Sequence, residues 1–546
     1  MNTGTNSVDN LRAEFRANRA RGGSEPAFAV LTRQLELQPV ETWLACAQDI
    51  AQLADEPLAA TWLQSAIARW PQAIQLHYWL AFVSWSRGDV SAAERQLREL
   101  LGRQPDHADA LRLLAMLLRN DGRFGAAAQL ALDSWRRQHG TVDNTLQCAD
   151  FIRHCQRQAL AAELCDEALH GGIRDPAIHA QAGMLALELG RFDAARSHLM
   201  AALDGGVDLN VWFVPAALAY AQRYSSARHP DFELFDRQLR NHALSQKAQA
   251  SVKFALAKAC DDIGDITRAA GLWREANLQA RAIKPWSSDT YRSRIAVLLK
   301  TSCGNFQLPP SDIIPIFIVG LPRSGTTLAA VLLGRHSQVR DRGELPHLGF
   351  IAERLSTGEH ENDAGALHEA ARLYYAHLRQ DDAPARWYID KTPVNFVRLD
   401  VVASLFPQAQ VIHCRRNRRD TALSLYSQFF AHTDGDFAYD FLDIAAFAAG
   451  HDQLMEHWRR TLPLSIHTLD YEELAQRPAQ TIAALRQRIG IADDNATVTR
   501  LPQDTVIASS SLWQATQPVY TSSIGRSRIY ASHLPELARL FPDMTC

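Results

Sequence analysis

The chain has 546 residues, of which 47% are apolar and 21% charged, and its formal net charge is −3 at pH 7. This composition is typical of a soluble globular protein of about two to four domains, and it argues against a disordered, fibrous or generally nucleic-acid-binding chain. Neither a signal-peptide core nor an apolar run of roughly 18 to 20 residues is found. We therefore expect an intracellular, cytoplasmic protein.

The cysteines and histidines give no sign of a metal site. Eight cysteines are scattered, with no Cys-x2-Cys pair, and His347, His413 and His467 do not share metal-ligand spacing. We expect free thiols in a reducing compartment and no bound metal.

Small residues recur in the N-terminal half with a period of 34 residues, which places five consecutive units between about residues 40 and 209. Glycines share this period, except that Gln156 stands where the pattern would place one. The three series are Ala59, Ala93, Ala127, Ala161 and Ala195; Ala47, Ala81, Ala115, Ala149 and Gly183; and Gly88, Gly122 and Gly190.

This period resembles the tetratricopeptide repeat, a helix–turn–helix unit whose small residues let paired helices approach closely. Residues 254–276 resemble a further unit after an irregular segment at 210–247, so the expected array spans 40–290, with a cap or degenerate repeat at 1–39. The alternative is an ordinary helical array whose alanines merely suit helices. The resemblance implies a groove that binds a protein or peptide.

After an expected linker at 291–314, short apolar runs alternate with helical stretches through 315–546. This alternation predicts an α/β domain with a parallel sheet and ligands at the carboxyl ends of its strands. The expected strands are IPIFIVG, RWYID, AQVIHC and LSIHTLD, and the expected helices follow Thr326, Phe396, Asp420 and Tyr471.

The first expected strand leads into GLPRSGTT, residues 320–327. Its glycines have the spacing of a nucleoside-triphosphate loop, Gly-x4-Gly-Lys-Ser/Thr, but Thr326 stands in the lysine position and Arg323 lies inside the loop. The start of the following helix favours an anion. Without a lysine for a γ phosphate, a phosphosulfate fits better than a triphosphate, and a loop that only stabilises its own turn is the alternative.

A second anion motif, CRRNRRDTALSLY, follows the strand AQVIHC. Arg416 stands at the end of this strand and Ser424 lies eight residues later on a helix, an arrangement suited to a separate phosphate. The neighbouring Arg415, Arg418 and Arg419 are expected to form a solvated basic face. Two phosphate sites on one sheet imply a nucleotide phosphorylated at two positions.

GLPRSGTT and RNRRDTALS together resemble the 5′-phosphosulfate loop and the 3′-phosphate motif, Arg-Asn-x-x-Asp-x-x-x-Ser, of the sulfotransferase superfamily. Through much of 315–530 the resemblance is greatest to tyrosylprotein sulfotransferases. The added repeats make the whole chain similar to a bacterial repeat-containing sulfotransferase. The resemblance implies 3′-phosphoadenosine 5′-phosphosulfate (PAPS) as donor and 3′-phosphoadenosine 5′-phosphate (PAP) as product, without a metal.

The resemblance also assigns roles to individual residues. Glu344, in RDRGELP, matches the catalytic base, and Lys391, in YIDKTP, matches a lysine on the transferring sulfuryl group. Arg323 and Ser511 complete the expected catalytic set. The residues expected to bind the donor are Arg323, Ser324, Gly325, Thr326 and Thr327 for the 5′ group, Arg416 and Ser424 for the 3′-phosphate, and Tyr471, Ser511 and Arg526 elsewhere on the nucleotide.

Two positions depart from the family pattern. Gln428 stands where the family often has an arginine, and Arg526 where it usually has a lysine. Structural roles are the alternative for three assignments, since Glu344 could be a solvated loop carboxylate, Lys391 could pair with Asp390, and Tyr471 could be core packing.

The expected function is transfer of a sulfuryl group to a hydroxyl, with tyrosine in a polypeptide recruited by the repeats as one candidate acceptor. Two alternatives stay open. One is a carbohydrate or small-molecule sulfotransferase whose repeats serve assembly, for instance as a homodimer, and the other is a non-catalytic scaffold.

Overall fold

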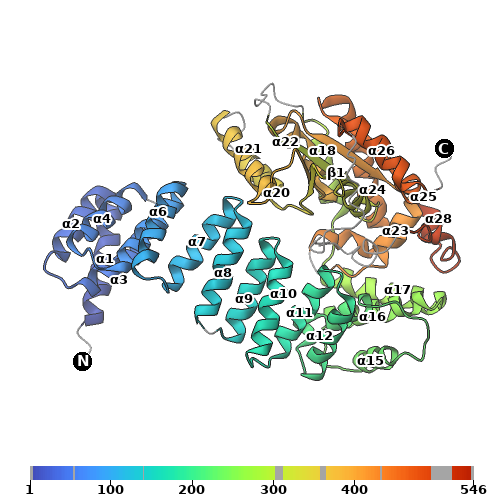
Figure 1. The fold of residues 1–546 in the computed structure, drawn as a ribbon, viewed down its shortest axis with the longest axis horizontal. Coiled ribbons are helices and arrows are strands. Elements are labelled where there is room, and N and C mark those ends of the chain that lie inside the picture. Colours follow the sequence, from blue (N-terminus) through green and yellow to red (C-terminus); the bar gives the residue numbers. More distant parts are fainter. Residues whose placement is uncertain are drawn as a thin grey trace. The chain divides into compact units, whose positions relative to one another are not determined.

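The structure is a computed structural model that describes residues 4–52, 56–138, 140–301, 311–356, 364–430, 433–492 and 519–542. It contains two compact units, unit 1 (Met1–Asn144) and unit 2 (Thr145–Cys546) (Figure 1). Within the described ranges, no helix is both long and apolar enough to cross a membrane.

Helix pairs with a step of 34 residues make up the N-terminal half, as the sequence predicts. Two series of helices each begin at this step, and α1 (Gly4–Gly22) and α2 (Ser24–Leu35) precede them. The first helices of the pairs are α3 (Val40–Ala51), α5 (Ile74–Ser86), α7 (Ala108–Asn120), α9 (Val142–His154) and α11 (Pro176–Glu188), and the second are α4 (Glu56–Arg69), α6 (Val90–Arg103), α8 (Phe124–Gln138), α10 (Gln158–His170) and α12 (Phe192–Asp204).

The periodic small residues lie where paired helices touch. At Gly183 a Cβ would stand 2.7 Å from Leu199 Cγ, closer than real carbon atoms approach. The alanines of the first series are fully buried for the same reason, namely Ala59, Ala93, Ala127, Ala161 and Ala195. The 34-residue period of small residues therefore results from close contact between paired helices.

Helices continue beyond the five regular pairs, and the irregular segment consists of short ones. The stretch 254–276 spans one more helical hairpin, with its turn at Gly264. These helices are α13 (Leu209–Trp212), α14 (Val214–Tyr220), α15 (Pro230–Leu239), α16 (Gln246–Asp262), α17 (Ile266–Ile283) and α18 (Ser288–Leu298).

A five-stranded parallel sheet, in the order β2-β3-β1-β4-β5, forms the centre of the C-terminal half. The four predicted strands are confirmed. The fifth strand, β2, was not predicted because three residues are too few to show an alternating pattern. The strands are β1 (Ile314–Gly320), β2 (Val339–Asp341), β3 (Trp387–Asp390), β4 (Gln410–Arg415) and β5 (Ser465–Asp470).

Alternate residues of β1 pack into different cores, because neighbouring side chains of a strand point to opposite faces. Ile316 and Ile318 join a cluster with residues of α19 (Thr326–Leu333) and α26 (Pro478–Ile489). Phe317 and Val319 join the large cluster on the other face. Helices in that cluster include α21 (Ala364–Arg379), α22 (Leu399–Leu405) and α24 (Phe441–Thr461). The sheet is therefore covered on both faces, as expected for parallel strands.

Shorter elements follow the carboxyl ends of the strands or close the domain. They are α20 (His347–Ser356), η1 (Pro393–Arg398), α23 (Arg418–Tyr426), η2 (Thr433–Tyr439), α25 (Tyr471–Gln476), η3 (Arg526–Arg528) and α28 (Glu536–Leu540).

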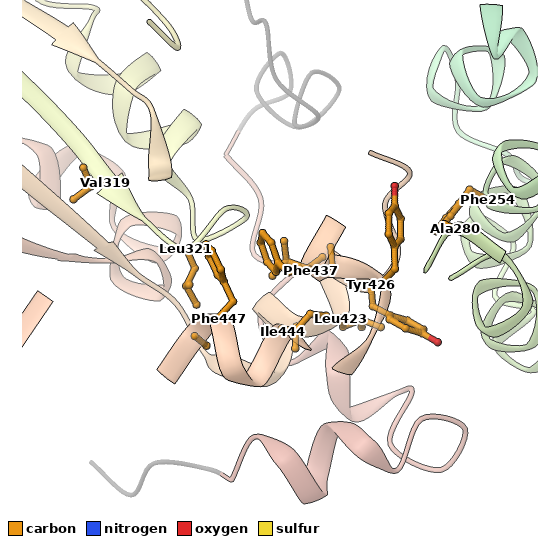
Figure 2. Packing of buried hydrophobic residues seen from close by; sticks show 14 of the residues in the cluster. Phe254, Ala280, Val319, Leu321, Leu423, Tyr426, Phe437, Ile444 and Phe447 are labelled. Carbon is orange, nitrogen blue, oxygen red and sulfur yellow. The ribbon is translucent and has the colours of Figure 1, made fainter. Parts of the chain in front are cut away.

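In unit 2 the repeat helices and the sheet domain share one apolar core (Figure 2). The Phe254 ring of α16 lies 5.8 Å from that of Phe429, and the Trp273 ring of α17 lies 5.2 Å from that of Tyr530. Figure 2 shows Phe254 and Ala280 on the repeat side of this core. The predicted domain limits at 290 and 315 thus fall inside a continuously packed unit, and as functional boundaries they stay a prediction.

Candidate active site

A cavity lies at the carboxyl edge of the sheet, where the segments that follow all five strands meet residues 519–526. Its wall includes nine of the predicted site residues. They are Arg323, Gly325, Thr326, Thr327, Glu344, Arg416, Ser424, Tyr471 and Arg526.

Three predicted residues are placed differently. Ser324 of the first loop is buried, at 2% exposure, and does not line the cavity. Lys391 also does not line it but contacts Glu344, which does. Ser511 lies outside the described residues.

The two glycines of the first loop are needed for close contacts. A Cβ on Gly320 would lie 2.5 Å from the carbonyl oxygen of Cys414, and one on Gly325 would lie 2.5 Å from Cδ2 of Tyr471. Gly325, with φ at 96°, is also the N-cap of α19 and offers no side chain to the first-turn N–H groups. Such a helix start binds anions well, since those N–H groups have no intrahelical acceptor.

The two predicted anion loops meet at this cavity. Arg323, at a φ of 71°, donates from Nε to Ser424 Oγ at 3.0 Å. Arg416 donates from Nη1 to the Arg323 carbonyl and from Nη2 to the Ser523 carbonyl, both at 3.0 Å. Its guanidinium lies 4.6 Å from the centre of the Tyr471 ring, so cation–π attraction also holds it. A single network therefore joins the loops after β1, β4 and β5.

The charges and bonding around these loops suit an anion. Burial, together with the neighbouring charge of Arg416, lowers the pKa of Arg323 to about 10, which leaves it charged at neutral pH. Ser324 Oγ and Arg416 Nε are buried without a hydrogen-bond partner in the described chain. Buried polar atoms usually have partners. Two close guanidiniums on the cavity wall, one of them with an unpartnered Nε, fit a bound phosphate or sulfuryl group.

Asn417 and Asp420 give the second motif its shape, a role that the sequence pattern alone did not reveal. Asn417 Oδ1 accepts the N–H groups of Arg419 and Asp420 and caps α23. Asp420, at 2% exposure, accepts the N–H of Gly525 at 2.6 Å and that of Ser527 at 2.8 Å. The motif carboxylate thereby fixes the turn that carries Arg526.

Repeat helices of unit 2 reach residues around the cavity. Arg526 forms an ion pair with Asp261 of α16, and the Tyr530 hydroxyl donates to the same carboxylate. Gln428, one of the family departures, donates to the hydroxyl of Tyr220 on α14 at 2.8 Å. These partners depend on packing between distant segments, so no local signal in the sequence could have found them.

Glu344, which lines the cavity, forms an ion pair with Lys391. Lys391 Nζ, on a residue that is 3% exposed, donates to Glu344 Oε1 at 2.5 Å, whereas the Glu344 side chain is 43% exposed. The described part of the chain offers no partner to Oε2 of Glu344. The alternative pairing of Lys391 with Asp390 is not seen, because Asp390 accepts from the hydroxyls of Tyr374 and Thr392 instead.

The cavity is also lined by residues that the sequence analysis did not single out, among them two with hydroxyl groups. Tyr520 and Ser523 both belong to the stretch SLWQATQPVYTSSIGR, and the Ser523 Oγ lies 2.5 Å from the Tyr471 hydroxyl. The only sequence signal for them was their closeness to Arg526.

The chain is similar in sequence to proteins that are themselves longer than the matched part. An uncharacterized protein of Aquifex aeolicus is 31% identical over 245 residues, with 42% of this chain and 32% of that protein covered. The nodulation protein NoeE of Sinorhizobium fredii is 33% identical over 129 residues, with 20% of this chain and 30% of that protein covered. The chain thus spans about a third of the length of these relatives.

Likenesses to solved structures are weak. The sulfotransferase domain from the curacin biosynthetic pathway is 18% identical, with a TM-score of 0.27, 42% of this chain and 98% of that chain covered. A thermophilic TPR protein of Thermus thermophilus is 18% identical, with a TM-score of 0.16, 48% of this chain and 100% of that chain covered. The fold is therefore assigned from the helices and strands of this structure and not from these likenesses. Residues 315–495, which contain the sheet and most of the cavity wall, match the model of the sulfotransferase family.

Proposed function

We propose that the chain transfers a sulfuryl group from PAPS to a hydroxyl acceptor. The observation that carries this proposal is the meeting of two anion loops at one cavity, where Arg323 of the first loop bonds Ser424 of the second at 3.0 Å. A nucleotide with phosphate groups at two positions matches such a pair of loops. The family match of residues 315–495 supports the same class of reaction.

In this proposal the donor lies with its two charged ends on the two loops. Arg416 and Ser424 hold the 3′-phosphate, while Arg323 and the first turn of α19 hold the 5′-phosphosulfate. Tyr471 and Arg526 complete the wall of the nucleotide site. The buried, unpartnered Nε of Arg416, a residue of the cavity wall, supports this placement because it lacks an acceptor, which an anion could supply.

Glu344 takes the proton of the acceptor hydroxyl. The acceptor oxygen then bonds the sulfur, the bond between sulfur and the bridging oxygen breaks, and its electron pair stays with the 5′-phosphate of the product. Arg323 stabilises the charge that develops on the oxygens, and Lys391, predicted to contact the sulfuryl group, acts from its place beside Glu344. A tyrosine hydroxyl has a pKa of about 10, so a general base contributes on the order of 10² to 10⁴ in rate.

For the acceptor we propose a tyrosine in a polypeptide bound by the repeats. The half-exposed Glu344 carboxylate supports this, since a base that lines the cavity and is open to solvent can be reached by a side chain on a large substrate. Incubation with labelled donor and a panel of tyrosine peptides, glycans and small phenols tests it. Transfer to glycans or phenols but not to tyrosine peptides would contradict the tyrosine acceptor. If the protein binds PAP but transfers no sulfuryl group to any acceptor, a non-catalytic scaffold is favoured.

Donor binding is tested by calorimetry with PAP, with and without a chelator. Arg416→Ala should lower PAP affinity by about 10- to 100-fold, because a charge-assisted hydrogen bond contributes roughly 1.5–3 kcal/mol. Arg415→Ala is the matched control, since the neighbouring Arg415 is 53% exposed and pairs with Asp470 at the surface. Equal affinity in both variants, or binding that requires a metal, would contradict the proposed site.

A further inference from the structure

The turn between α9 and α10 differs from the corresponding turns of other repeats. Gly88, Gly122 and Gly190 occupy this position elsewhere, with φ between 68° and 81°. Gln156 adopts the same left-handed backbone, at 57°, although it has a Cβ. The strain of this conformation is of the same order as the net contribution of one hydrogen bond. Stability alone therefore gives no reason for glutamine over glycine here.

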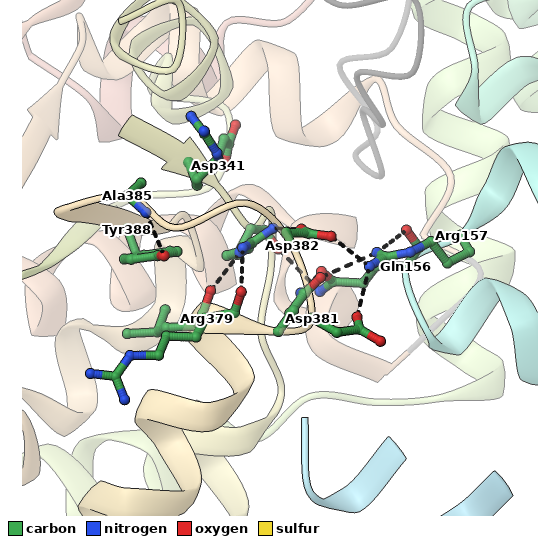
Figure 3. Close-up of polar contacts among 12 residues, drawn as sticks. Gln156, Arg157, Asp341, Arg379, Asp381, Asp382, Ala385 and Tyr388 are labelled. Atoms are coloured by element: carbon green, nitrogen blue, oxygen red, sulfur yellow. Dashed lines mark hydrogen bonds and ion pairs between the residues drawn. The ribbon is translucent and has the colours of Figure 1, made fainter. Parts of the chain in front are cut away.

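The Gln156 side chain reaches the sheet domain of unit 2 (Figure 3). Its Nε2 donates to the carbonyl oxygen of Arg342 at 3.1 Å, and its Oε1 accepts from Gln380 Nε2 at 2.7 Å. The next residue, Arg157, donates to Gln380 at 3.2 Å and to Asp382 at 2.9 Å. This repeat turn is therefore bonded to two segments of the domain that contains the cavity.

Arg342 begins the short segment that ends in Glu344. Its N–H donates to the carbonyl of Ile389 at 2.9 Å, and the carbonyl of Gly343 accepts the N–H of Lys391 at 2.8 Å. The bond from Gln156 falls on the Arg342 carbonyl, between these two anchors. The backbone that carries Glu344 is thus held by β3 and by the repeat turn together.

Arg342 is also fixed through its side chain. Its guanidinium, 7% exposed, donates to the carbonyls of Leu378 and Arg379 and pairs with Asp382. Because Asp382 also pairs with Arg157, one carboxylate joins the repeat turn to the Glu344 segment. Gln156 adds the direct contact to the backbone.

We propose that Gln156 is a positioning residue for the transfer reaction. Its amide holds the segment from Arg342 to Glu344, so that the Glu344 carboxylate stays on Lys391 and at the cavity. This inference rests on the proposed function, in which Glu344 takes the acceptor proton. It gives the repeat array a part in the chemical step besides any part in recruiting an acceptor.

The test compares two substitutions in the full chain. Gln156→Gly restores the residue that other repeats have, removes the backbone strain and removes the side-chain hydrogen bonds to Arg342 and Gln380. We expect its thermal midpoint to stay close to that of the wild type and kcat with a tyrosine peptide to fall about 2- to 10-fold, the effect of one hydrogen bond. PAP affinity should not change. Gln156→Glu, which keeps the size but lacks the Nε2 donor, should lower kcat similarly.

Gly190→Gln is the matched control, because it puts glutamine into the same position of the next repeat. It should lower the thermal midpoint, since Gly190 has a φ of 68°, and leave kcat unchanged. If Gln156 had only a structural role, kcat would fall in each variant only to the extent that the thermal midpoint falls. Wild-type kcat in Gln156→Gly overturns the proposal.

A second measurement separates this inference from the proposed function. If the wild type binds PAP but transfers no sulfuryl group, the proposed function fails, and hydrogen–deuterium exchange then tests the positioning role. Amides of residues 342–345 should exchange faster in Gln156→Gly than in the wild type and in Gly190→Gln. Unchanged exchange would show that Gln156 does not hold this segment.

Discussion

Replacing Asp420 by alanine should weaken donor binding, although Asp420 is itself negatively charged. The Asp420 carboxylate accepts the N–H groups of Gly525 and Ser527 and so fixes the turn between them. Arg526, which lines the cavity, stands in the middle of that turn. Without the carboxylate, both N–H groups lose their acceptor, and the backbone that carries Arg526 is held less firmly, although the ion pair of Arg526 with Asp261 remains.

The size of the effect follows from these contacts. If Arg526 contributes one charge-assisted bond to the donor, roughly 1.5–3 kcal/mol, its misplacement lowers PAP affinity by about 10- to 100-fold. The two unpaired N–H groups lower the free energy of unfolding by about 2–6 kcal/mol if both stay buried. Loss of the negative charge of Asp420 acts in the opposite direction, since it reduces the repulsion between the cavity wall and the anionic donor. We expect position to dominate because two close N–H donors already compensate the charge of Asp420.

Calorimetry with PAP and urea unfolding measure the two quantities. The control is Asp440→Ala, because Asp440 accepts the N–H groups of Leu442 and Asp443 at the start of α24 but does not line the cavity. It should lower stability by about 1 kcal/mol and leave PAP affinity unchanged. Tighter PAP binding in Asp420→Ala would refute the reasoning by showing that charge outweighs position. Equal losses of affinity in both variants would refute it as well, by showing a general effect of destabilisation.

Three further predictions concern other parts of the chain. Deletion of residues 1–144 removes no residue that lines the cavity, so PAP affinity should be kept, and a clear loss by calorimetry would show that unit 1 contributes to the site. Glu344→Gln should lower kcat by about 10² to 10⁴ with PAP affinity kept, because a base acts on the chemical step, and full activity would assign the base elsewhere. Burial, and then the charge of His451, lowers the pKa of His413 to about 2. Since an unfolded histidine titrates near about 6.5, this residue costs stability as pH falls below that value, by up to about 1.4 kcal/mol per pH unit. Urea unfolding at mildly acidic and neutral pH should show a smaller loss in His413→Gln, and an equal loss would contradict the assignment.

The parts of this fold that depend on local pattern could be predicted from the sequence. The apolar run before Gly320 and the one before Cys414 predicted β1 and β4, because buried parallel strands are continuous apolar runs. The period of small residues predicted the helical hairpins, since close helix packing leaves no room for larger side chains. The strand signal lies in a single short run and the repeat signal in the spacing between successive units, so neither requires knowledge of contacts between unrelated segments.

The parts that depend on contacts between distant segments could not be predicted. Asp261 is an ordinary residue near the end of a repeat helix, and only packing brings it to Arg526. The role of Asp420 was hidden for the same reason, since its partners lie more than a hundred residues away. The departure at Gln156 was visible as a missing glycine, but its partner on Arg342 was not.

The shared core of unit 2 has a consequence for how this protein can vary. Trp273 and Phe254 are almost fully buried, and part of what covers them belongs to the sheet domain. A chimera that replaces α14–α17 with helices of another repeat protein would remove the side chains against which Phe429 and Tyr530 pack. The helices and the sheet should therefore melt in one cooperative transition in scanning calorimetry. Repeats can be gained, lost or exchanged in unit 1 without exposing this core, so variation in repeat number is expected there.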